Sequence, residues 1–196
     1  LTEKKEHTQI YTNINLKKII LYEGVINPSR GLDKVIPAMR EIENAELWIA
    51  GDGPKKTEYI ALTKSLGLEG CVKFLGKLHP EDLREITHKA DVGLSIEENN
   101  GLSYYYSMPN KISDYIQARI PIIVSDFPEM RKAVDGYKSG EKIDNYSQLP
   151  EKIKIVLHNG KEFYKDNLNL AATELCWEKE EPKIISLFQK VKNAQS

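Results

Sequence analysis

Short apolar segments recur along the chain from Lys18 onward, and each has the length of a β-strand. Their residues are continuously apolar instead of alternating with polar ones, which is typical of strands buried on both faces of a parallel sheet. Five such segments occur, at residues 19–24, 46–51, 71–76, 91–97 and 120–125. A weaker sixth segment lies near residues 139–143.

Helical patterns fill the intervals between the strand segments. After the first strand, apolar residues recur every three or four positions from Leu32 to Ile42, although Pro37 should kink or shorten this helix. Similar patterns predict helices over residues 55–68, 80–90, 110–119 and 127–135, and further helices after the sixth strand as far as Val191. Repeated strand–helix units with right-handed crossovers predict an α/β fold, namely a doubly wound parallel sheet in a Rossmann-like three-layer α/β/α sandwich.

The whole chain, residues 1–196, is predicted to form one domain, with a core at 18–160 and C-terminal helices at 161–194. Its length is enough for a single full hydrophobic core, and no internal repeat or low-complexity segment divides it. The chain does not begin with methionine, and its first residues form a polar segment without a strand pattern. This start suggests a piece of a longer protein.

Composition and charge argue against several classes of partner. The net charge is −1 with 29% charged residues, so nothing favours bulk binding to nucleic acid or to an anionic membrane. No apolar run reaches the roughly 18 residues of a transmembrane segment, and no signal peptide is evident. Cys71 and Cys176 lie in apolar or amphipathic surroundings, as expected for reduced cysteines of a cytoplasmic protein.

In a doubly wound sheet, ligands bind beyond the carboxyl ends of the strands, so the loops after the strands are the places to search for chemistry. The first loop begins at Gly24, which lets the backbone approach a ligand, and reaches Arg30 just before a helix. A helix N-terminus favours an anion, and a guanidinium group matches phosphate oxygens. The alternative is a surface arginine beside an ordinary helix start. No Walker A motif is present, because no Gly-Lys-Ser/Thr follows the glycine at the required spacing.

The second and third loops carry weaker signals. Gly51 and Gly53 form a Gly-x-Gly pair, but the third glycine of a dinucleotide-binding fingerprint is missing because position 56 is lysine. A tight strand-to-helix turn is therefore a better interpretation than an NAD site. The third loop either forms a plain connection or offers backbone groups to the edge of a flat base, from Gly76, Lys77 and Leu78.

The fourth loop, residues 97–109, is polar and contains three successive tyrosines, which are more readily core or interface residues than ligand contacts. Asn110 and Asp114 follow on one face of the next helix, since they are four residues apart. Lys111 falls in the first turn, where a cation is unfavourable against the helix dipole unless an anion lies nearby. An anionic ligand would explain this lysine. The alternative is a solvated lysine, with Asp114 paired locally.

Taken together in order and spacing, these loops resemble the donor domain of the group 1 (family 4) retaining glycosyltransferases, which have the GT-B fold. The resemblance runs from about residue 20 to residue 134 and rests on five segments: YEGVINPSRGLD, LWIAGDGP, CVKFLGKL, KADVGLS and SDYIQARIPIIVS. Each segment is common by itself, but five in register over more than a hundred residues are specific. The resemblance implies that the chain is one half of a GT-B enzyme.

The resemblance implies which residues contact the phosphates. Gly24 and Arg30 correspond to the loop that holds the donor diphosphate, and Gly51 belongs to the next matching segment. Val25 stands where the family often has arginine, so one cation is missing, and Lys111 can supply it. Arg30 and Lys111 are therefore the expected catalytic residues, since they would stabilise the charge that develops on the departing nucleoside diphosphate. Backbone amides that meet the phosphates are expected at Ser107, Met108 and Asn110.

The resemblance also implies the nucleoside and sugar contacts. The segment that grips the nucleobase corresponds to Gly76, Lys77 and Leu78. Asp114 corresponds to the glutamate that binds the ribose hydroxyls. Tyr106 stands where a first glutamate would touch the donor sugar, so recognition of the sugar departs from the family pattern. Candidate substitutes for that glutamate are Glu97, Glu98 and a rearranged segment 104–110.

The implied function is glycosyl transfer from a nucleoside-diphosphate sugar, UDP- or GDP-linked, with retention of configuration. No Asp-x-Asp motif or histidine cluster occurs, so neither a metal nor another cofactor is expected. The acceptor, a sugar or lipid-linked molecule of polysaccharide, lipopolysaccharide or glycolipid synthesis, would bind an N-terminal domain that lies outside this chain. The fragment alone should be inactive, and the whole protein cytoplasmic or peripheral at the inner membrane.

Three other functions stay open at this point. A nucleotide-sugar 2-epimerase half would share the donor side. A nucleotide-binding module that has lost catalysis would explain the missing glutamate at Tyr106. A flavodoxin-like or receiver domain fits less well, because a receiver needs an acidic cluster after the first strand, where only Glu23 lies beside Gly24.

Overall fold

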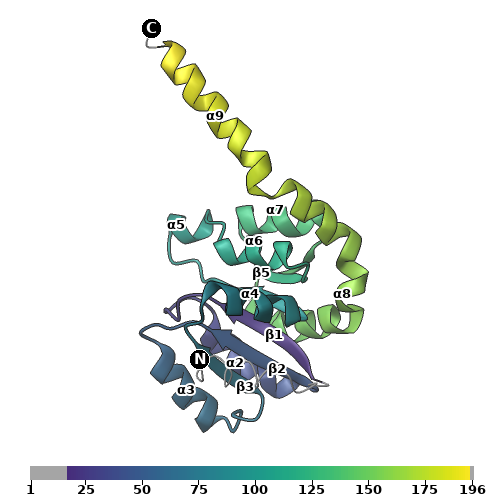
Figure 1. Cartoon of the computed structure of the whole chain (residues 1–196). Helices are drawn as coiled ribbons and strands as arrows, with labels where there is room; N and C mark the ends of the chain where they lie inside the picture. Colours follow the sequence, from purple (N-terminus) through teal and green to yellow (C-terminus); the bar gives the residue numbers. More distant parts are fainter. Residues whose placement is uncertain (1–16, 195–196) are drawn as a thin grey trace, which may run out of the picture.

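Six parallel strands form one sheet in the computed structural model, which describes residues 17–194 (Figure 1). The strands are β1 (Lys18–Glu23), β2 (Ala45–Ala50), β3 (Val72–Gly76), β4 (Val92–Ser95), β5 (Ile122–Ser125) and β6 (Gly140–Ile143). Their order is β3-β2-β1-β4-β5-β6, and every neighbouring pair is parallel. The direction of winding reverses between β1 and β4, so the predicted doubly wound, Rossmann-like sheet is confirmed.

Helices connect the strands and cover both faces of the sheet. They are α2 (Leu32–Ala38), α3 (Lys56–Ser65), α4 (Pro80–Lys89), α5 (Leu102–Tyr105), α6 (Asn110–Gln117), α7 (Pro128–Tyr137), α8 (Leu149–Glu174) and α9 (Trp177–Ala194), with 3₁₀ turns η1 (Met39–Glu41) and η2 (Tyr146–Gln148). Right-handed crossovers place α2 and α3 on one face, where they pack together, and α4, α6 and α7 on the other. This arrangement is the expected three-layer sandwich.

Three local features can be compared with the sequence expectation. The helix after β1 ends as α2 at Ala38 and continues as η1, in keeping with the effect predicted for Pro37. β4 ends at Ser95, two residues early, because the carbonyl groups of Ile96 and Glu97 accept hydrogen bonds from side chains of Tyr146 and Ser125. The loop after β4 also contains the short helix α5, which was not predicted from the polar sequence of that loop.

A buried tyrosine fixes α6 against the carboxyl end of β1. A side chain at Gly93 of β4 would place its Cβ 2.4 Å from the Tyr115 ring, so the glycine makes room for that ring. The Tyr115 hydroxyl accepts a hydrogen bond from the Glu23 backbone N–H (3.0 Å) and lies 3.3 Å from the Leu21 carbonyl oxygen. The helix that carries Lys111 and Asp114 is thereby held in register with the loop that begins at Gly24.

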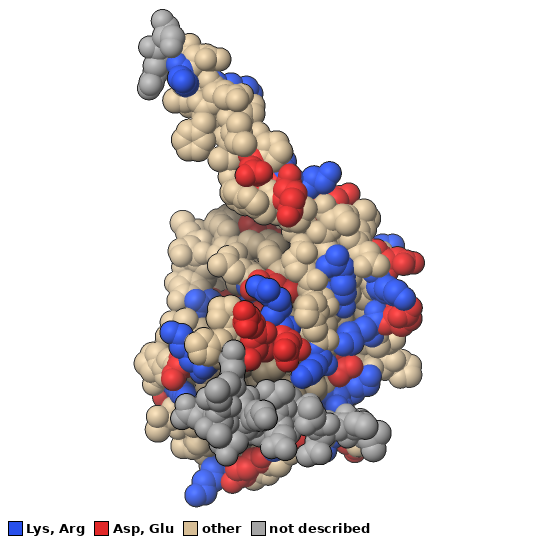
Figure 2. Space-filling view, in the orientation of Figure 1, with Lys and Arg blue, Asp and Glu red and all other residues tan. Residues whose placement is uncertain are grey.

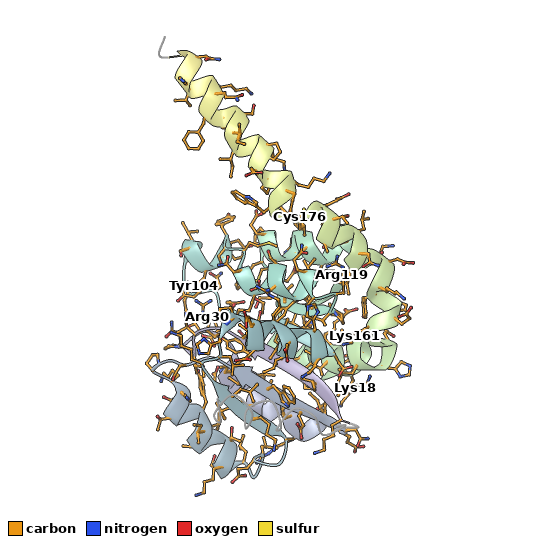
Figure 3. The ribbon with its side chains drawn as sticks, viewed as in Figure 1. Lys18, Arg30, Tyr104, Arg119, Lys161 and Cys176 are labelled. Atoms are coloured by element: carbon orange, nitrogen blue, oxygen red, sulfur yellow. The ribbon has the colours of Figure 1, made fainter. Side chains whose placement is uncertain are left out.

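The long helix α8 contacts both helical layers. It has a break at Gly160, whose φ of 71° is in the left-handed region that glycine adopts easily. α8 packs against α2 on one face of the sheet and against α6 and α7 on the other. Lys161, labelled in Figure 3, lies just after the break. Its Nζ donates hydrogen bonds to the carbonyl oxygens of His88 (3.2 Å) and Ala90 (2.9 Å). α8 therefore wraps around the sheet instead of lying on one side of it.

The last helix, α9, projects away from the sheet (Figure 1). Its exposed apolar residues are Trp177, Ile184, Ile185, Leu187, Phe188 and Val191. On the visible face of the molecule, acidic and basic side chains intermix (Figure 2), in keeping with a net charge of −1. No helix within the described residues is long and apolar enough to cross a bilayer. The polar start of the chain, residues 1–16, lies outside the described part.

Candidate functional site

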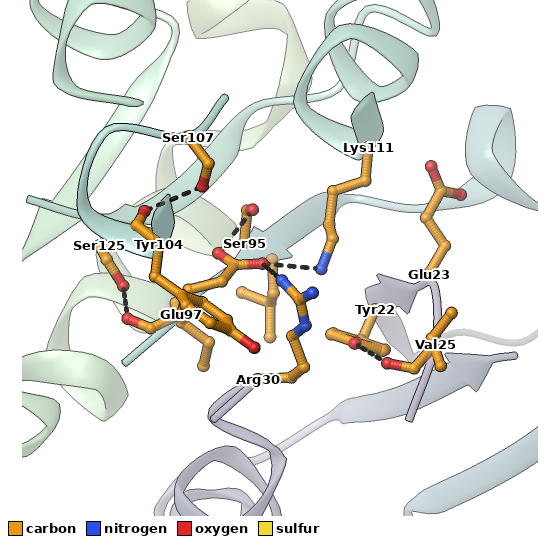
Figure 4. A network of polar contacts seen from close by, with 12 residues as sticks. Tyr22, Glu23, Val25, Arg30, Ser95, Glu97, Tyr104, Ser107, Lys111 and Ser125 are labelled. Atoms are coloured by element: carbon orange, nitrogen blue, oxygen red, sulfur yellow. Dashed lines mark hydrogen bonds and ion pairs between the residues drawn. The ribbon is translucent and has the colours of Figure 1, made fainter. Parts of the chain in front are cut away.

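A buried carboxylate lies where the loops after β1 and β4 meet the start of α6. The side chain of Glu97 has no exposed area. Its Oε1 is 3.0 Å from Lys111 Nζ and 3.4 Å from Arg30 Nη1, and its Oε2 accepts a hydrogen bond from Ser95 Oγ (2.9 Å) (Figure 4). Buried charges are stable only when they are paired and hydrogen-bonded, and here one carboxylate pairs with two cations. We call Arg30, Glu97 and Lys111 the cation cluster.

The Arg-Gly pair at the start of α2 brings Arg30 to Glu97. Gly31 has a φ of 72°, and a Cβ there would lie 2.4 Å from the Ile96 carbonyl oxygen. Only glycine allows this close approach of two backbones. The adjoining Glu98 N–H donates to the Ser29 carbonyl oxygen (3.0 Å) and holds the two loops together. The sequence feature that first indicated a ligand loop is thus what assembles the cluster.

Aromatic rings flank both cations. The Arg30 guanidinium lies 5.4 Å from the centroid of the Tyr104 ring, and Figure 3 shows the two side chains side by side. Lys111 Nζ lies 4.2 Å from the centroid of the Tyr22 ring, whose hydroxyl donates to the Val25 carbonyl oxygen. Rings at these distances attract a cation through their quadrupole. Each cation is therefore held by an acid and an aromatic ring.

Lys111 is buried, so the alternative of a solvated lysine is wrong. Its side chain is 9% exposed. Burial lowers the pKa of Lys111, and the neighbouring Glu97 carboxylate opposes that change. The anion that the helix start requires is Glu97, within the protein itself. The position of Lys111 is consequently explained without a ligand, and the case for a diphosphate rests on the convergence of two cations.

Gly24 and Gly51 contribute to the site in different ways. A Cβ at Gly24 would lie 3.8 Å from Lys111 Cε, so Gly24 joins the edge of the cation cluster. A Cβ at Gly51 would lie 1.9 Å from the Gly24 carbonyl oxygen. Gly51 therefore permits the close approach of the β1 and β2 ends. Its contact is with the Gly24 backbone, and it supports the loop that carries Arg30.

The segment between α5 and α6 is more exposed than the cluster. Tyr106 and Met108 are 58% and 37% exposed, and the Tyr105 ring packs edge-on against Tyr106. The Ser107 backbone N–H donates to the Tyr104 carbonyl oxygen at 3.3 Å, so a phosphate would have to replace that hydrogen bond. Asn110 is the first residue of α6, where backbone N–H groups lack helical partners.

A pocket of about 400 Å³ lies between α4 and α6. Its walls are Glu23, Pro80, Leu83, Arg84, Thr87, His88, Asp114, Gln117 and Ala118. Asp114, the predicted ribose ligand, lines it, and burial raises the pKa of this carboxyl while Arg84 opposes the change. The loop residues Gly76, Lys77 and Leu78 lead into α4, which begins at Pro80. Of the predicted nucleoside contacts, Asp114 therefore lines the pocket, one helical turn along α6 from Lys111, whereas Gly76, Lys77 and Leu78 are not among its lining residues.

Two acidic residues at the site have roles that the sequence did not reveal. Glu97 was a candidate for the missing sugar-binding glutamate, but both of its oxygens are engaged and its side chain is buried. Glu23, at the end of β1, is 3% exposed and accepts a hydrogen bond from Thr87 Oγ1 (2.9 Å). The available signal was the same for both: an acid directly after a continuous apolar strand.

Two other features lie apart from this site. A hollow of about 650 Å³ beside β6 and α8 is lined by none of the predicted site residues, all of which the structure describes. Within residues 17–194, no three His, Cys, Asp or Glu side chains gather as ligands for a metal ion.

Comparison with known sequences decides the family. Residues 3–172, most of the chain, match the family of glycosyl transferases group 1. The chain belongs to this glycosyltransferase family. The group 1 resemblance drawn from the loop motifs is therefore confirmed.

Individual relatives of this glycosyltransferase chain are distant or short matches. The lipopolysaccharide core biosynthesis glycosyltransferase LpsD of Rhizobium meliloti is 43% identical over 58 residues, 30% of this chain and 17% of the relative. The chitobiosyldiphosphodolichol beta-mannosyltransferase of Candida albicans is 24% identical over 158 residues, 74% of this chain and 34% of the relative. The chain thus spans about a third or less of either relative.

Solved structures support the GT-B fold of the family. Sucrose-phosphate synthase of Thermosynechococcus elongatus superposes with a TM-score of 0.80 at 17% identity, over 99% of this chain and 49% of that one. Anabaena HepE in complex with UDP gives a TM-score of 0.79 at 14% identity, over 95% of this chain and 52% of that one. At these identities the likeness concerns the fold, and the glycosyltransferase chain spans about half of each.

Proposed function

We propose that this chain is the nucleotide-sugar-binding half of a glycosyltransferase that uses a UDP- or GDP-linked sugar. The observation that carries the proposal is the convergence of Arg30 and Lys111 on the carboxyl edge of the sheet, beside Gly24. Membership of the glycosyltransferase family supports the reaction class. The UDP complex of the structurally similar HepE supports a nucleoside diphosphate as the ligand.

In this proposal the diphosphate lies against the cation cluster and the first turn of α6. When the glycosyl bond breaks, negative charge develops on the departing diphosphate. Arg30 and Lys111, held in place by Glu97, stabilise that charge without moving, which is the kind of electrostatic help that is worth about 3 kcal/mol for one donor. The N–H groups at the start of α6 add to the effect because they lie at the positive end of the helix dipole.

The nucleoside occupies the pocket between α4 and α6, where Asp114 accepts hydrogen bonds from the ribose hydroxyls. The donor sugar then lies toward the segment that includes Tyr106. We further propose that transfer retains configuration, transfers a hexose and needs no metal, and that the acceptor binds to another part of the enzyme, in the cytoplasm or at the inner membrane. The names of the two relatives, one of lipopolysaccharide core synthesis and one acting on a dolichol-linked saccharide, support an acceptor of this class.

The test is the thermal stability of this chain with UDP, GDP, ADP and CMP at millimolar concentration. A ligand at about 100 times its Kd adds roughly 2.7 kcal/mol to the free energy of unfolding, which raises the Tm by roughly 5–10 °C. We expect a shift with one nucleoside diphosphate, lost in Arg30→Ala and kept in Arg40→Ala, which removes an exposed guanidinium on η1. An unchanged shift in Arg30→Ala would contradict the proposal.

A further inference from the structure

We propose that Glu23 selects the nucleobase of the donor, and that the base is guanine. The inference rests on the proposed function, since it concerns the base of the nucleotide that the chain is proposed to bind. It adds a residue to which the family resemblance gives no role. Glu23 is one of the residues that line the pocket between α4 and α6, and it is 3% exposed.

The starting observation is an unpaired oxygen. Within the described residues, Glu23 Oε1 is the one buried side-chain nitrogen or oxygen that has no hydrogen-bond partner. Buried polar atoms are almost always paired, because an unpaired one loses its hydrogen bonds to water and destabilises the fold. Because Glu23 lines a pocket, its unpaired oxygen is explained if a ligand that enters the pocket donates a hydrogen bond to it.

The second observation is that the carboxyl group is held in place from the other side. Thr87 of α4 donates to Glu23 Oε2 at 2.9 Å, while its hydroxyl also contacts the Leu83 carbonyl oxygen. The backbone N–H of Glu23 donates to Tyr115 on α6. Both helices that form the pocket therefore hold Glu23 in place. A residue that recognises one edge of a ligand must be held rigidly in this way.

The third observation is the position of Glu23 along the proposed path of the nucleotide. Gly24, the next residue, borders the cation cluster. Asp114 lines the same pocket as Glu23 and lies one helical turn beyond Lys111. A nucleotide with its diphosphate at Lys111 and its ribose at Asp114 would thus place its base in this pocket, against the apolar surface of Pro80 and Leu83.

The chemistry of a carboxylate distinguishes the bases. An ionised carboxylate only accepts hydrogen bonds. Guanine presents two adjacent donors on one edge, N1–H and the 2-amino group. Uracil presents a single N3–H between two carbonyl oxygens, and a carboxylate repels those oxygens. Adenine and cytosine each present one amino group beside a ring nitrogen that accepts hydrogen bonds. Guanine is the base that fits Glu23, and a good bidentate pair of this kind discriminates by roughly 5- to 150-fold in affinity.

The experiment is calorimetric titration of the chain with GDP, UDP and IDP at pH 8, where Glu23 is mainly ionised. IDP has the N1–H of GDP but lacks the 2-amino group. We expect GDP to bind roughly 10 times or more as tightly as UDP, with IDP between them. In Glu23→Gln, which keeps the shape but replaces one acceptor by a donor, the preference for GDP over UDP should fall to about 2-fold or less. Glu85→Gln, which changes an exposed carboxyl on α4 outside this pocket, should keep it.

Two outcomes would overturn the inference. Equal affinity of the unmodified chain for GDP and UDP would overturn it while leaving the proposed function intact. An undiminished preference for GDP in Glu23→Gln would overturn the role of Glu23 alone. Failure of every nucleoside diphosphate to bind would instead overturn the proposed function, and this inference with it.

Discussion

Lys111 Nζ lies 3.0 Å from Glu97 Oε1, and both side chains are buried. Removing two charges from water is costly, and a buried pair offsets that cost only when its geometry is good and its other atoms are hydrogen-bonded. Ser95 and Arg30 provide those further contacts. The site therefore holds two cations close together before any ligand binds, because Glu97 screens their mutual repulsion.

Glu97→Gln should lower the free energy of unfolding by about 3–5 kcal/mol, since it leaves a buried lysine without its carboxylate. Urea denaturation followed by circular dichroism measures the effect. Glu98→Gln is the matched control, because it removes the neighbouring carboxylate outside the cation cluster and should change stability by less than about 1 kcal/mol. If both variants lost the same unfolding free energy, the loss would come from changing the loop and not from removing the carboxylate that pairs with Lys111.

The double variant Glu97→Gln/Lys111→Met separates stability from ligand binding. Removing both partners of a buried pair costs much less than removing one, so the double variant should be more stable than Glu97→Gln by about 2 kcal/mol. It should nevertheless fail to bind a nucleoside diphosphate, because one cation is gone. Strictly additive losses of stability would contradict the coupling, and full ligand affinity would contradict a role for Lys111.

Tyr115→Phe should lower the free energy of unfolding by about 1–3 kcal/mol, because the buried Glu23 N–H loses its acceptor. Chemical denaturation tests this, with Tyr137→Phe as the control. The Tyr137 hydroxyl donates a hydrogen bond to the Glu174 carboxylate at the surface, so its loss should cost about 0.5 kcal/mol or less. Equal losses of unfolding free energy in the two variants would argue that the Tyr115 hydroxyl does not hold α6 against β1.

Two glycines with the same backbone angle allow strain and steric clash to be measured separately. Gly31 and Gly67 have φ values of 72° and 68°, but only at Gly31 would a Cβ meet another backbone, that of Ile96. Gly67→Ala should cost about 1 kcal/mol through backbone strain alone. Gly31→Ala should cost at least about 2 kcal/mol more and displace Arg30 from Glu97. Denaturation curves of both variants decide this, and equal costs would exclude the clash.

Stability should fall as the pH rises from about 4.5 to about 7. Burial raises the pKa of Glu23 to about 7, with Asp114 raising it further and Thr87 and Lys111 opposing. Between the unfolded and folded pKa values the folded state binds a proton that the unfolded chain has released, so unfolding becomes easier with rising pH, by about 3 kcal/mol in total.

The measurement is the pH dependence of stability in the unmodified chain minus that in Glu23→Gln. This difference isolates the contribution of the Glu23 carboxyl from that of the rest of the chain. Curves that stay parallel from pH 4.5 to 7.5 would contradict a raised pKa at Glu23.

Much of the fold could be predicted from sequence because the signals are local. Continuous apolar segments predicted five of the six strands, a weaker segment indicated the sixth, and proline at position 37 marked where a helix would end. Arg30 was found because it lies between a glycine loop and a helix start, where a guanidinium can bind phosphate, and Lys111 because a cation in a first helical turn is unusual. Glu97 as their shared counter-ion could not be found in this way, because its partners lie 67 and 14 residues away and no spacing rule links them. Glu23 was overlooked because its burial depends on α4 and α6.

The path of α8 affects how the protein unfolds. A helix that packs on α2, on α6 and on α7 ties the two layers to each other independently of the sheet between them. Loosening its second half removes the hydrogen bonds from Lys161 to the end of α4 and from Gln117 to Ala172. Partial opening on one face therefore weakens the other, and we expect unfolding to be cooperative across the whole sandwich, with amide protons on both faces exchanging at similar rates.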